Sequence, residues 1–289
     1  MQIFLNGLIS GLPIALLAIA FSIVYVPTGV FYLGLGAVYA TSPFIAWLLL
    51  QLGWSVSFVL ITALIVGIVI SLLIEWMNHW PLERKKSGFG THMIASLGVY
   101  ILIVQLLALF GGQQTKVLRT GLDTVFRFEG IIVTGAQFVQ LLVSIILILG
   151  FYIWLKFSNL GLQLRGLSEN PTEFALRGSS MRKLRFLAFG ISGFLASASA
   201  LVVSYEVGFD PNIGLQALLS AIVAMIIGGR HSFLGPALGG VLLGILQSQA
   251  VWFFSAKWQM AVTFILLVLF LFLRPHGIFG ARLRLEAQS

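Results

Sequence analysis

The chain has 289 residues, of which 59% are hydrophobic and only 9% are charged, and its mean hydropathy is +1.03. The first charged residue is Glu75, and later charge-free runs extend over 186–205, 212–229, 232–256 and 258–273. Because an ion near the bilayer centre costs several kcal/mol, these runs indicate that lipid surrounds much of the chain. The composition excludes a soluble globular protein, and the absence of cysteine excludes disulfides, thiolate metal sites and a thiol nucleophile.

The rule that a span needs about 20 apolar residues predicts nine helices along the chain. In order they are 3–26, 29–52, 54–76, 91–111, 138–156, 186–205, 213–229, 236–254 and 257–273. The second and seventh are the weakest, because Gly34, Gly36 and Pro43 interrupt one and the other is short. We therefore predict an all-α, polytopic helical membrane protein of eight or nine spans, forming one domain over 1–289. The first run lacks a preceding basic region, so we interpret it as a retained span and not as a signal peptide.

The basic residues predict the orientation, since loops rich in Lys and Arg stay in the cytoplasm. One face carries Arg84, Lys85, Lys86, Lys156, Arg165, Arg177, Arg182, Lys183, Arg185, Arg230, Arg274, Arg282 and Arg284. The other face carries Lys116, Arg119, Arg127 and Lys257. The N-terminus is therefore predicted outside and the C-terminus inside, with an external loop over 112–137. The net charge of +8 fits basic loops beside anionic lipid, and an acidic partner is the alternative.

Two short patterns recur. Ile9-Ser10-Gly11 returns as Ile191-Ser192-Gly193, and Gly34-Leu35 returns as Gly214-Leu215. The copies lie five positions apart in the order of predicted spans (first and sixth, second and seventh), so they would run in opposite directions, as in the inverted repeats that place transport sites near the midplane. Chance in a chain rich in Gly, Ala and Leu explains the match equally well.

Small residues also recur at the spacing that lets helix backbones approach closely. The pairs are Gly7/Gly11, Gly235/Gly239 and Gly240/Gly244. They fit either a compact bundle or an interface between subunits.

The most informative polar segment is 164–185, which contains a short capped helix. Asn170 is a good N-cap, Pro171 suits the first helical position, and Glu173 is placed as the acid of a capping box. Gly178 supplies a left-handed stop. Since two turns of helix are unstable alone in water, we expect a cytoplasmic partner, or alternatively the lipid headgroups, to pack on it. The contacting side chains would be Phe174, Ala175 and Leu176, with Glu173 and Arg177 as an i,i+4 pair.

Motifs for chemistry are missing. There is no G-x-x-x-x-G-K-[ST] loop for a nucleotide phosphate and no His-Glu-x-x-His or other cluster of metal ligands. The stretch 190–193 is similar to the G-x-S-G of intramembrane serine proteases. That chemistry needs a histidine at membrane depth, whereas His79, His92, His231 and His276 fall in loops or at span ends. We expect no enzyme, no metal and no cofactor in this chain, and no nucleic-acid partner.

Ion-coupled carriers usually keep a carboxylate or histidine within the membrane, whereas Glu75 and Glu206 lie at span ends. A path through this protein would be lined by neutral groups, and the candidates are Tyr32, Tyr39, Thr41, Ser42, Gln216 and Ser220. Each of these fits a hydrogen bond between helices equally well. The energy source is therefore expected in another subunit.

Four segments together resemble the membrane-spanning permease of ATP-binding-cassette importers for branched-chain amino acids, a family with urea and amide relatives. They are 165–178, 221–230, 235–240 and 274–280, and the opening at 4–11 is similar as well. The resemblance covers nearly the whole chain in order and is strongest in the second half.

One stretch departs from that family. Its second span usually carries Asn-x-Ala-His-Gly, where this chain reads Val30-Phe-Tyr-Leu-Gly34. The choice of solute stays open for that reason, and the aromatic residues favour a bulkier or more apolar one.

The resemblance implies that the helix around 170–178 is a coupling helix seated in a cytoplasmic ATPase subunit, with Glu173, Ala175 and Gly178 as the matched positions. It further implies a second, homologous permease, two ATPase subunits that bind ATP and Mg²⁺, and a periplasmic solute-binding protein that faces 112–137 and 206–212. The expected function is translocation of a branched-chain or related amino acid across a bacterial inner membrane by alternating access. The alternatives are a urea, amide or sugar permease, an ion-coupled secondary transporter, and an intramembrane enzyme that uses Ser192.

Overall fold

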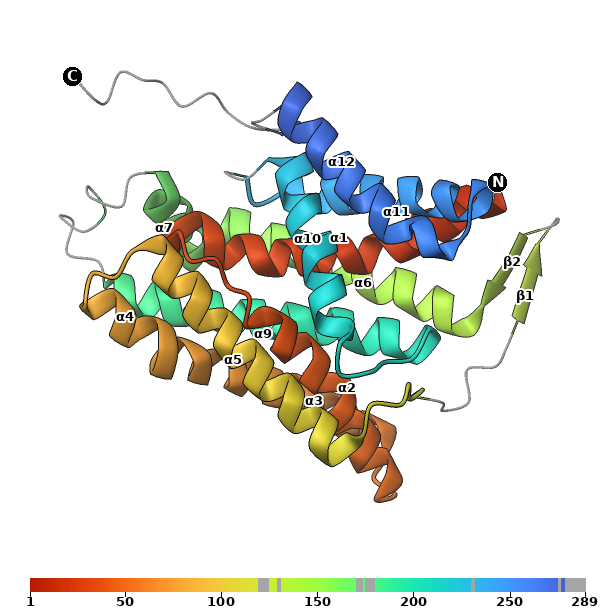
Figure 1. Ribbon diagram of the computed structural model, residues 1–289, viewed down its shortest axis with the longest axis horizontal. Coiled ribbons are helices and arrows are strands. Elements are labelled where there is room, and N and C mark those ends of the chain that lie inside the picture. Colours follow the sequence, from red (N-terminus) through yellow and green to blue (C-terminus); the bar gives the residue numbers. More distant parts are fainter. Residues whose placement is uncertain are drawn as a thin grey trace.

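A computed structural model describes residues 1–118, 125–128, 131–169, 174, 180–229, 232–274 and 277–278. These residues form a helical bundle with a small hairpin at one end (Figure 1). The apolar helices are α1 (Gln2–Thr28), α2 (Leu35–Gln51), α3 (Val56–Ile74), α5 (Phe89–Gly111), α6 (Gly135–Phe157), α9 (Met181–Glu206), α10 (Ile213–Gly228), α11 (Gly235–Phe253) and α12 (Gln259–Leu273). They match the nine predicted ranges in order, which confirms the all-α, multi-span prediction.

Two of these helices are short. In the described part of the chain, seven helical segments are long and apolar enough to cross a membrane, whereas α2 has 17 residues and α10 has 16. At 1.5 Å per residue each of the two covers about 25 Å, less than the hydrocarbon thickness of about 30 Å. Both therefore fall short of a full span.

The predicted start of the second span, at residue 29, is wrong. Gly29 ends α1 in the left-handed conformation (φ 66°), with its N–H bonded to the Tyr25 carbonyl, as in a common helix stop. The chain then turns back inside the protein, where Val30 and Tyr32 are buried, and α2 begins only at Leu35.

The third span is longer than predicted. Beyond α3 the chain forms one turn of π-helix, η1 (Glu75–His79), and then α4 (Trp80–Arg84). Single π turns within helices occur frequently at functional sites.

The predicted loop over 112–137 contains regular structure. Strands β1 (Val125–Phe128) and β2 (Ile131–Thr134) form an antiparallel pair in which Val125 faces Thr134. Thr134 then caps α6 in a reciprocal capping box with Gln137, so the last three residues of the predicted loop are helical. Shorter elements elsewhere are α7 (Asn159–Glu169) and η2 (Ala256–Trp258).

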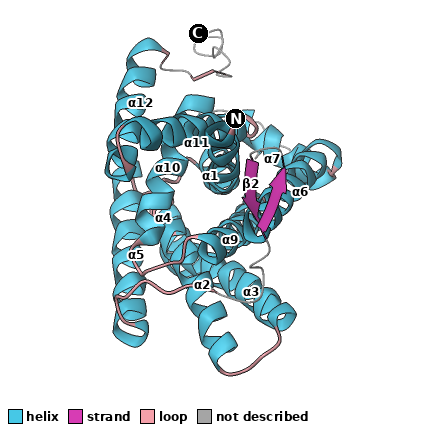
Figure 2. Ribbon diagram, turned by 90° about the vertical axis from the view of Figure 1, so that its right-hand side faces the viewer, coloured by secondary structure: helices cyan, strands magenta, loops and turns pink. Residues whose placement is uncertain are grey.

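Helix α1 lies at the centre, against α9, α10 and α11 (Figure 2). Its glycines meet those of α11, because a Cβ atom on Gly244 would lie 2.2 Å from the Gly11 Cα, and one on Gly240 would lie 2.4 Å from the Ala15 Cα. Gly239 approaches the Ala224 carbonyl of α10 equally closely. The small-residue pairs therefore serve packing within the chain.

The two predicted repeat copies also meet. Ser192 of α9 donates to the Ala20 carbonyl of α1 and Ser199 donates to the Pro13 carbonyl, so the two helices pack antiparallel. The starts of α2 and α10 touch, since a Cβ atom on Gly214 would lie 2.0 Å from the Gly36 carbonyl oxygen. This is the arrangement expected of an inverted repeat.

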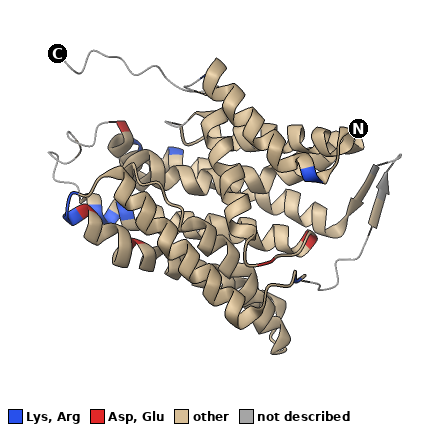
Figure 3. Ribbon diagram, in the orientation of Figure 1, with Lys and Arg blue, Asp and Glu red and all other residues tan. Residues whose placement is uncertain are grey.

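Charge separates the two ends of the bundle (Figure 3). The N-terminal end, as we call it, carries the start of α1 and the hairpin, whereas the basic end carries α4, α7 and the start of α9. Most of the described Lys and Arg residues gather at the basic end, and few lie toward the other.

Candidate functional site

Two adjoining cavities of about 310 and 270 Å³ open among the helices at the N-terminal end. They share Ser10, Glu206, Gln247 and Gln259, and we call them together the polar chamber. Helices α1, α2, α6, α9, α10, α11 and α12 all contribute to its lining. On α1 the lining runs from Asn6 to Leu17, a rise of about 16 Å, so the chamber reaches well into the bundle.

A proline in α1 positions one wall. Pro13 has no N–H, so the carbonyl of Ile9 four residues earlier lacks its helical partner. The Gln140 amide nitrogen of α6 donates to that carbonyl at 2.9 Å. Gln140 is only 2% exposed, and its oxygen Oε1 has no partner among the described residues.

A carboxylate lies on the same side of the chamber. Gln137 accepts from the Thr134 N–H at 3.2 Å within the capping box, and its amide nitrogen donates to Glu206 Oε1 at 2.7 Å. Glu206 is the last residue of α9 and forms no ion pair with any residue that the structure describes. The capping box therefore holds one acidic group at the mouth of the chamber.

The opposite wall is closed by its own hydrogen bonds. Gln247 of α11 donates to the Thr263 hydroxyl at 2.6 Å and accepts from the Gln259 amide at 3.2 Å. Thr263 in turn donates to the Gln259 carbonyl at 2.9 Å. These bonds tie α11 to α12 and engage both the nitrogen and the oxygen of the Gln247 amide.

The chamber contains half of the candidate path residues. Tyr39, Gln216 and Ser220 line it. Tyr32 lies near the basic end and donates to Ser71. Thr41 and Ser42 bond to carbonyls of their own helix, and Ser42 also bonds to Ser197 of α9.

Sequence reasoning missed the residues that only meet across helices, chiefly Gln140 and Glu206. A signal was present, since Gln140 is an isolated amide in an apolar span and Pro13 frees a carbonyl on another span. What the sequence lacked was the pairing of those two spans.

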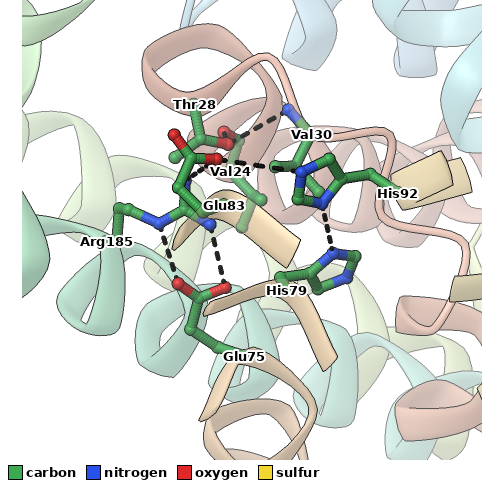
Figure 4. Close-up of polar contacts among 8 residues, drawn as sticks. All are labelled: Val24, Thr28, Val30, Glu75, His79, Glu83, His92 and Arg185. Atoms are coloured by element: carbon green, nitrogen blue, oxygen red, sulfur yellow. Dashed lines mark hydrogen bonds and ion pairs between the residues drawn. The ribbon is translucent and has the colours of Figure 1, made fainter. Parts of the chain in front are cut away.

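A second group of ionisable side chains lies at the basic end (Figure 4). Arg185, early in α9, donates to both oxygens of Glu75 at 2.8 and 3.3 Å, and its Nη1 lies 3.1 Å from Glu83. Glu75 is fully buried in the π turn and Arg185 is 6% exposed. These three residues, together with His79 and His92, form what we call the charged cluster.

The two histidines extend this cluster. Their Nδ1 atoms lie 3.3 Å apart in stacked rings, and His92 Nε2 lies 3.8 Å from Glu83. Among the described residues no group of three or more His, Cys, Asp and Glu side chains is arranged to hold a metal ion.

Most of the predicted coupling helix lies outside the described residues, namely Asn170, Pro171, Glu173, Ala175, Arg177 and Gly178. Phe174 is described, is helical, and packs partly buried against the main hydrophobic core. The helices on either side, α7 and α9, place the segment's two ends at the basic end.

Comparisons with known proteins agree on the family. The sequence profile of the family described as "Branched-chain amino acid transport system / permease component" matches residues 3–271. The chain is 28% identical to the high-affinity branched-chain amino acid transport system permease protein BraD of Pseudomonas aeruginosa, over 97% of this chain and 95% of BraD. It is 25% identical to the corresponding protein LivH of Escherichia coli K12, over the same shares.

A solved structure shares the fold. A chain of PsaBC from Streptococcus pneumoniae in complex with Fab aligns with a TM-score of 0.56 over 96% of this chain and 94% of that chain, at 14% identity. Together with the apolar helices, these relatives identify a multi-pass protein of the bacterial inner membrane. Since the profile covers nearly all of its length, the chain belongs to the permease components of branched-chain amino acid transport systems.

Proposed function

We propose that this chain is the permease subunit of an ATP-driven importer that moves a branched-chain or related amino acid across the inner membrane. The observation that carries the proposal is the polar chamber, which lies where the two repeat copies meet. Interrupted, short helices in corresponding positions of two inverted halves mark the binding site in many transporters, and α2 and α10 both line this chamber.

The proposed energy source is a pair of ATPase subunits, which bind ATP and Mg²⁺. The segment around Glu173, Ala175 and Gly178 would sit in an ATPase groove, between α7 and α9. Movement of that segment would reach the bundle directly, because Arg185 at the start of α9 is bonded to η1 and α4.

Two further partners complete the proposal. A second permease would close the path on the side of Gln216 and Gln259, which are exposed in the single chain. A periplasmic solute-binding protein would dock at the N-terminal end, where Lys116 and Phe209 form a backbone bridge between two polar segments. In this proposal the N-terminal end faces outside and the basic end faces the cytoplasm, as the positive-inside rule favours.

The alternative solutes are urea, an amide or a sugar. The carboxylate at the chamber mouth has no counterpart in such neutral molecules, so the amino acid is preferred.

The first test is co-purification in detergent with co-encoded ATPase subunits. Wild type is compared with the double variant Glu173→Arg/Ala175→Glu, and with Asp210→Arg as a charge reversal at the opposite end. We expect wild type and Asp210→Arg to retain the ATPase and the double variant to lose it. Wild-type protein that runs alone and moves solute in liposomes without ATP would be a secondary transporter, and the proposal would be wrong.

A further inference from the structure

The polar chamber carries a single charge. Among its lining residues Glu206 is the only ionisable acid or base apart from the Tyr39 phenol, and no described cation pairs with it. Gln137 occupies Oε1 through a neutral amide hydrogen bond. A carboxylate held in this way attracts cations into the cavity that it borders.

A second acceptor lies on the same wall. The Gln140 amide group is oriented by its bond to the Ile9 carbonyl, which uses the nitrogen and leaves Oε1 unpartnered within the described structure. An acceptor buried to this degree without a donor is destabilising, because it has lost its hydrogen bond to water. Since Gln140 lines the chamber, a donor from a bound molecule that reached Oε1 would satisfy this acceptor.

Several other polar groups of the lining make hydrogen bonds of their own. Ser199 gives its hydroxyl hydrogen to the Pro13 carbonyl, Ser220 gives its own to Gln216, and Gln247 donates to Thr263. Glu206 is thus the negative acceptor of the chamber and Gln140 Oε1 a neutral acceptor without a described donor, beside an apolar surface formed by Ile14, Leu17 and Val203.

We propose that Glu206 and Gln140 Oε1 bind the protonated amino group of the solute, while its aliphatic side chain lies against α1. An ammonium group brings three N–H donors and one positive charge, which matches both acceptors. The inference rests on the proposed function, since it names the part of the solute that this permease recognises.

Hydration is the competing explanation, because water also supplies donors to Glu206 and Gln140. A test must therefore ask whether the chamber selects cations. The chain has no cysteine, so Ser10→Cys places a single thiol in it, and Ser10 is exposed and lines both cavities together with Glu206.

The probes are 2-aminoethyl and 2-sulfonatoethyl methanethiosulfonate, applied to the full-length protein in membranes at low ionic strength. The rate at which each reagent modifies the protein thiol is divided by the rate at which it modifies a free small thiol. We expect the cationic reagent to be favoured about tenfold in Ser10→Cys, by the local field of the carboxylate. The preference should fall toward one in Ser10→Cys/Glu206→Gln and persist in Ser10→Cys/Asp210→Asn. An equal preference in all three variants overturns the proposal.

Transport gives the second readout. Wild type, Glu206→Gln and Gln140→Met are reconstituted with the ATPase subunits and the binding protein, and offered L-leucine, 4-methylpentanoate, ribose and urea. We expect wild type to take up leucine alone, Glu206→Gln to take up at least tenfold less, and Gln140→Met to fall between them, with equal ATPase co-purification. Wild-type uptake of ribose or urea that Glu206→Gln leaves unchanged overturns the amino-group site but not the permease assignment. Loss of ATPase association in wild type overturns the proposed function itself.

Discussion

The charged cluster and the polar chamber differ in how their charges are paired, although each also holds one buried atom without a partner among the described residues, His79 Nε2 and Gln140 Oε1. At the basic end, Arg185 lies between Glu75 and Glu83, so each charge has a partner within 3.3 Å. At the N-terminal end, Glu206 has only an amide partner and Gln140 keeps a free oxygen.

This difference indicates a structural role for the charged cluster and a binding role for the polar chamber. A buried ion pair satisfied within the protein holds helices together, and removing one partner leaves the other buried without a counter-charge. A buried polar group left without a partner destabilises the fold, and a bound ligand can supply the missing partner. The two regions should therefore respond differently to substitution, in stability at the basic end and in transport at the N-terminal end.

The largest effect on stability is expected from Arg185→Met, which leaves the fully buried carboxylate of Glu75 without its ionic partner. The loss should be about 3–5 kcal/mol, and the apparent thermal midpoint in detergent should fall by roughly 10 °C. The double variant Glu75→Leu/Arg185→Met should recover most of it, because the carboxylate that remains, Glu83, is half exposed. If Arg185→Met unfolds at the same temperature as wild type, the cluster does not hold α9 to η1.

Gly244→Leu comes next and acts on the chamber through packing. Its Cβ atom would overlap Gly11, so α1 and α11 must separate, at a cost of about 1–3 kcal/mol or more. Because both helices line the chamber, uptake should be lost as well. Gly150→Leu on α6 is the matched control, since a Cβ atom there meets nothing within 4 Å. Equal melting and uptake of the two variants would contradict the close helix contact.

Tyr32 lies toward the charged cluster and Tyr39 lines the polar chamber, so substitutions at the two positions compare the regions directly. Tyr32→Phe removes one buried hydrogen bond to Ser71, which should lower stability by about 0.5–1.5 kcal/mol and leave uptake unchanged. Tyr39→Phe also removes a buried hydrogen bond, to Ser199, so it should lower stability by a similar amount, but in the chamber it should reduce uptake as well. Thermal melting and solute uptake are measured on both variants. Loss of uptake in Tyr32→Phe and not in Tyr39→Phe would place the path at Tyr32.

The smallest effect on stability is expected from Glu206→Gln. The side chain is partly exposed and has no ionic partner among the described residues, so the change should stay within about 0.5 kcal/mol. Melting curves of this variant should overlay wild type while its uptake falls. A drop as large as that of Arg185→Met would make Glu206 a structural residue.

Much of the fold was predictable from particular segments. The nine apolar runs fixed the helices because lipid tolerates only helices with satisfied backbones, and the boundaries of α5, α10 and α11 agree within two residues. The start of α2 was missed. The left-handed Gly29 and the buried turn after it consist of apolar and small residues, so hydropathy alone does not distinguish them from a continuous span. The hairpin in the predicted external loop was missed because its strands have only four residues each.

The site was less predictable. Tyr39, Gln216 and Ser220 could be named as polar groups in apolar spans, but so could Thr41 and Ser42, which serve helix contacts. All five lie in apolar helices, so the local sequence does not separate the two groups. Only the direction of each side chain within the bundle separates them.

The sequence by itself determined the solvent, the helical class and the uneven distribution of charge, because these follow from composition and from distances of a few residues. The tertiary structure decided which polar groups meet. Glu75 and Arg185 are 110 residues apart, and Gln140 lies 131 residues from the carbonyl that orients it. Interactions over such separations depend on how helices pack, and packing is set by the summed contacts of many apolar side chains and glycines rather than by any local pattern.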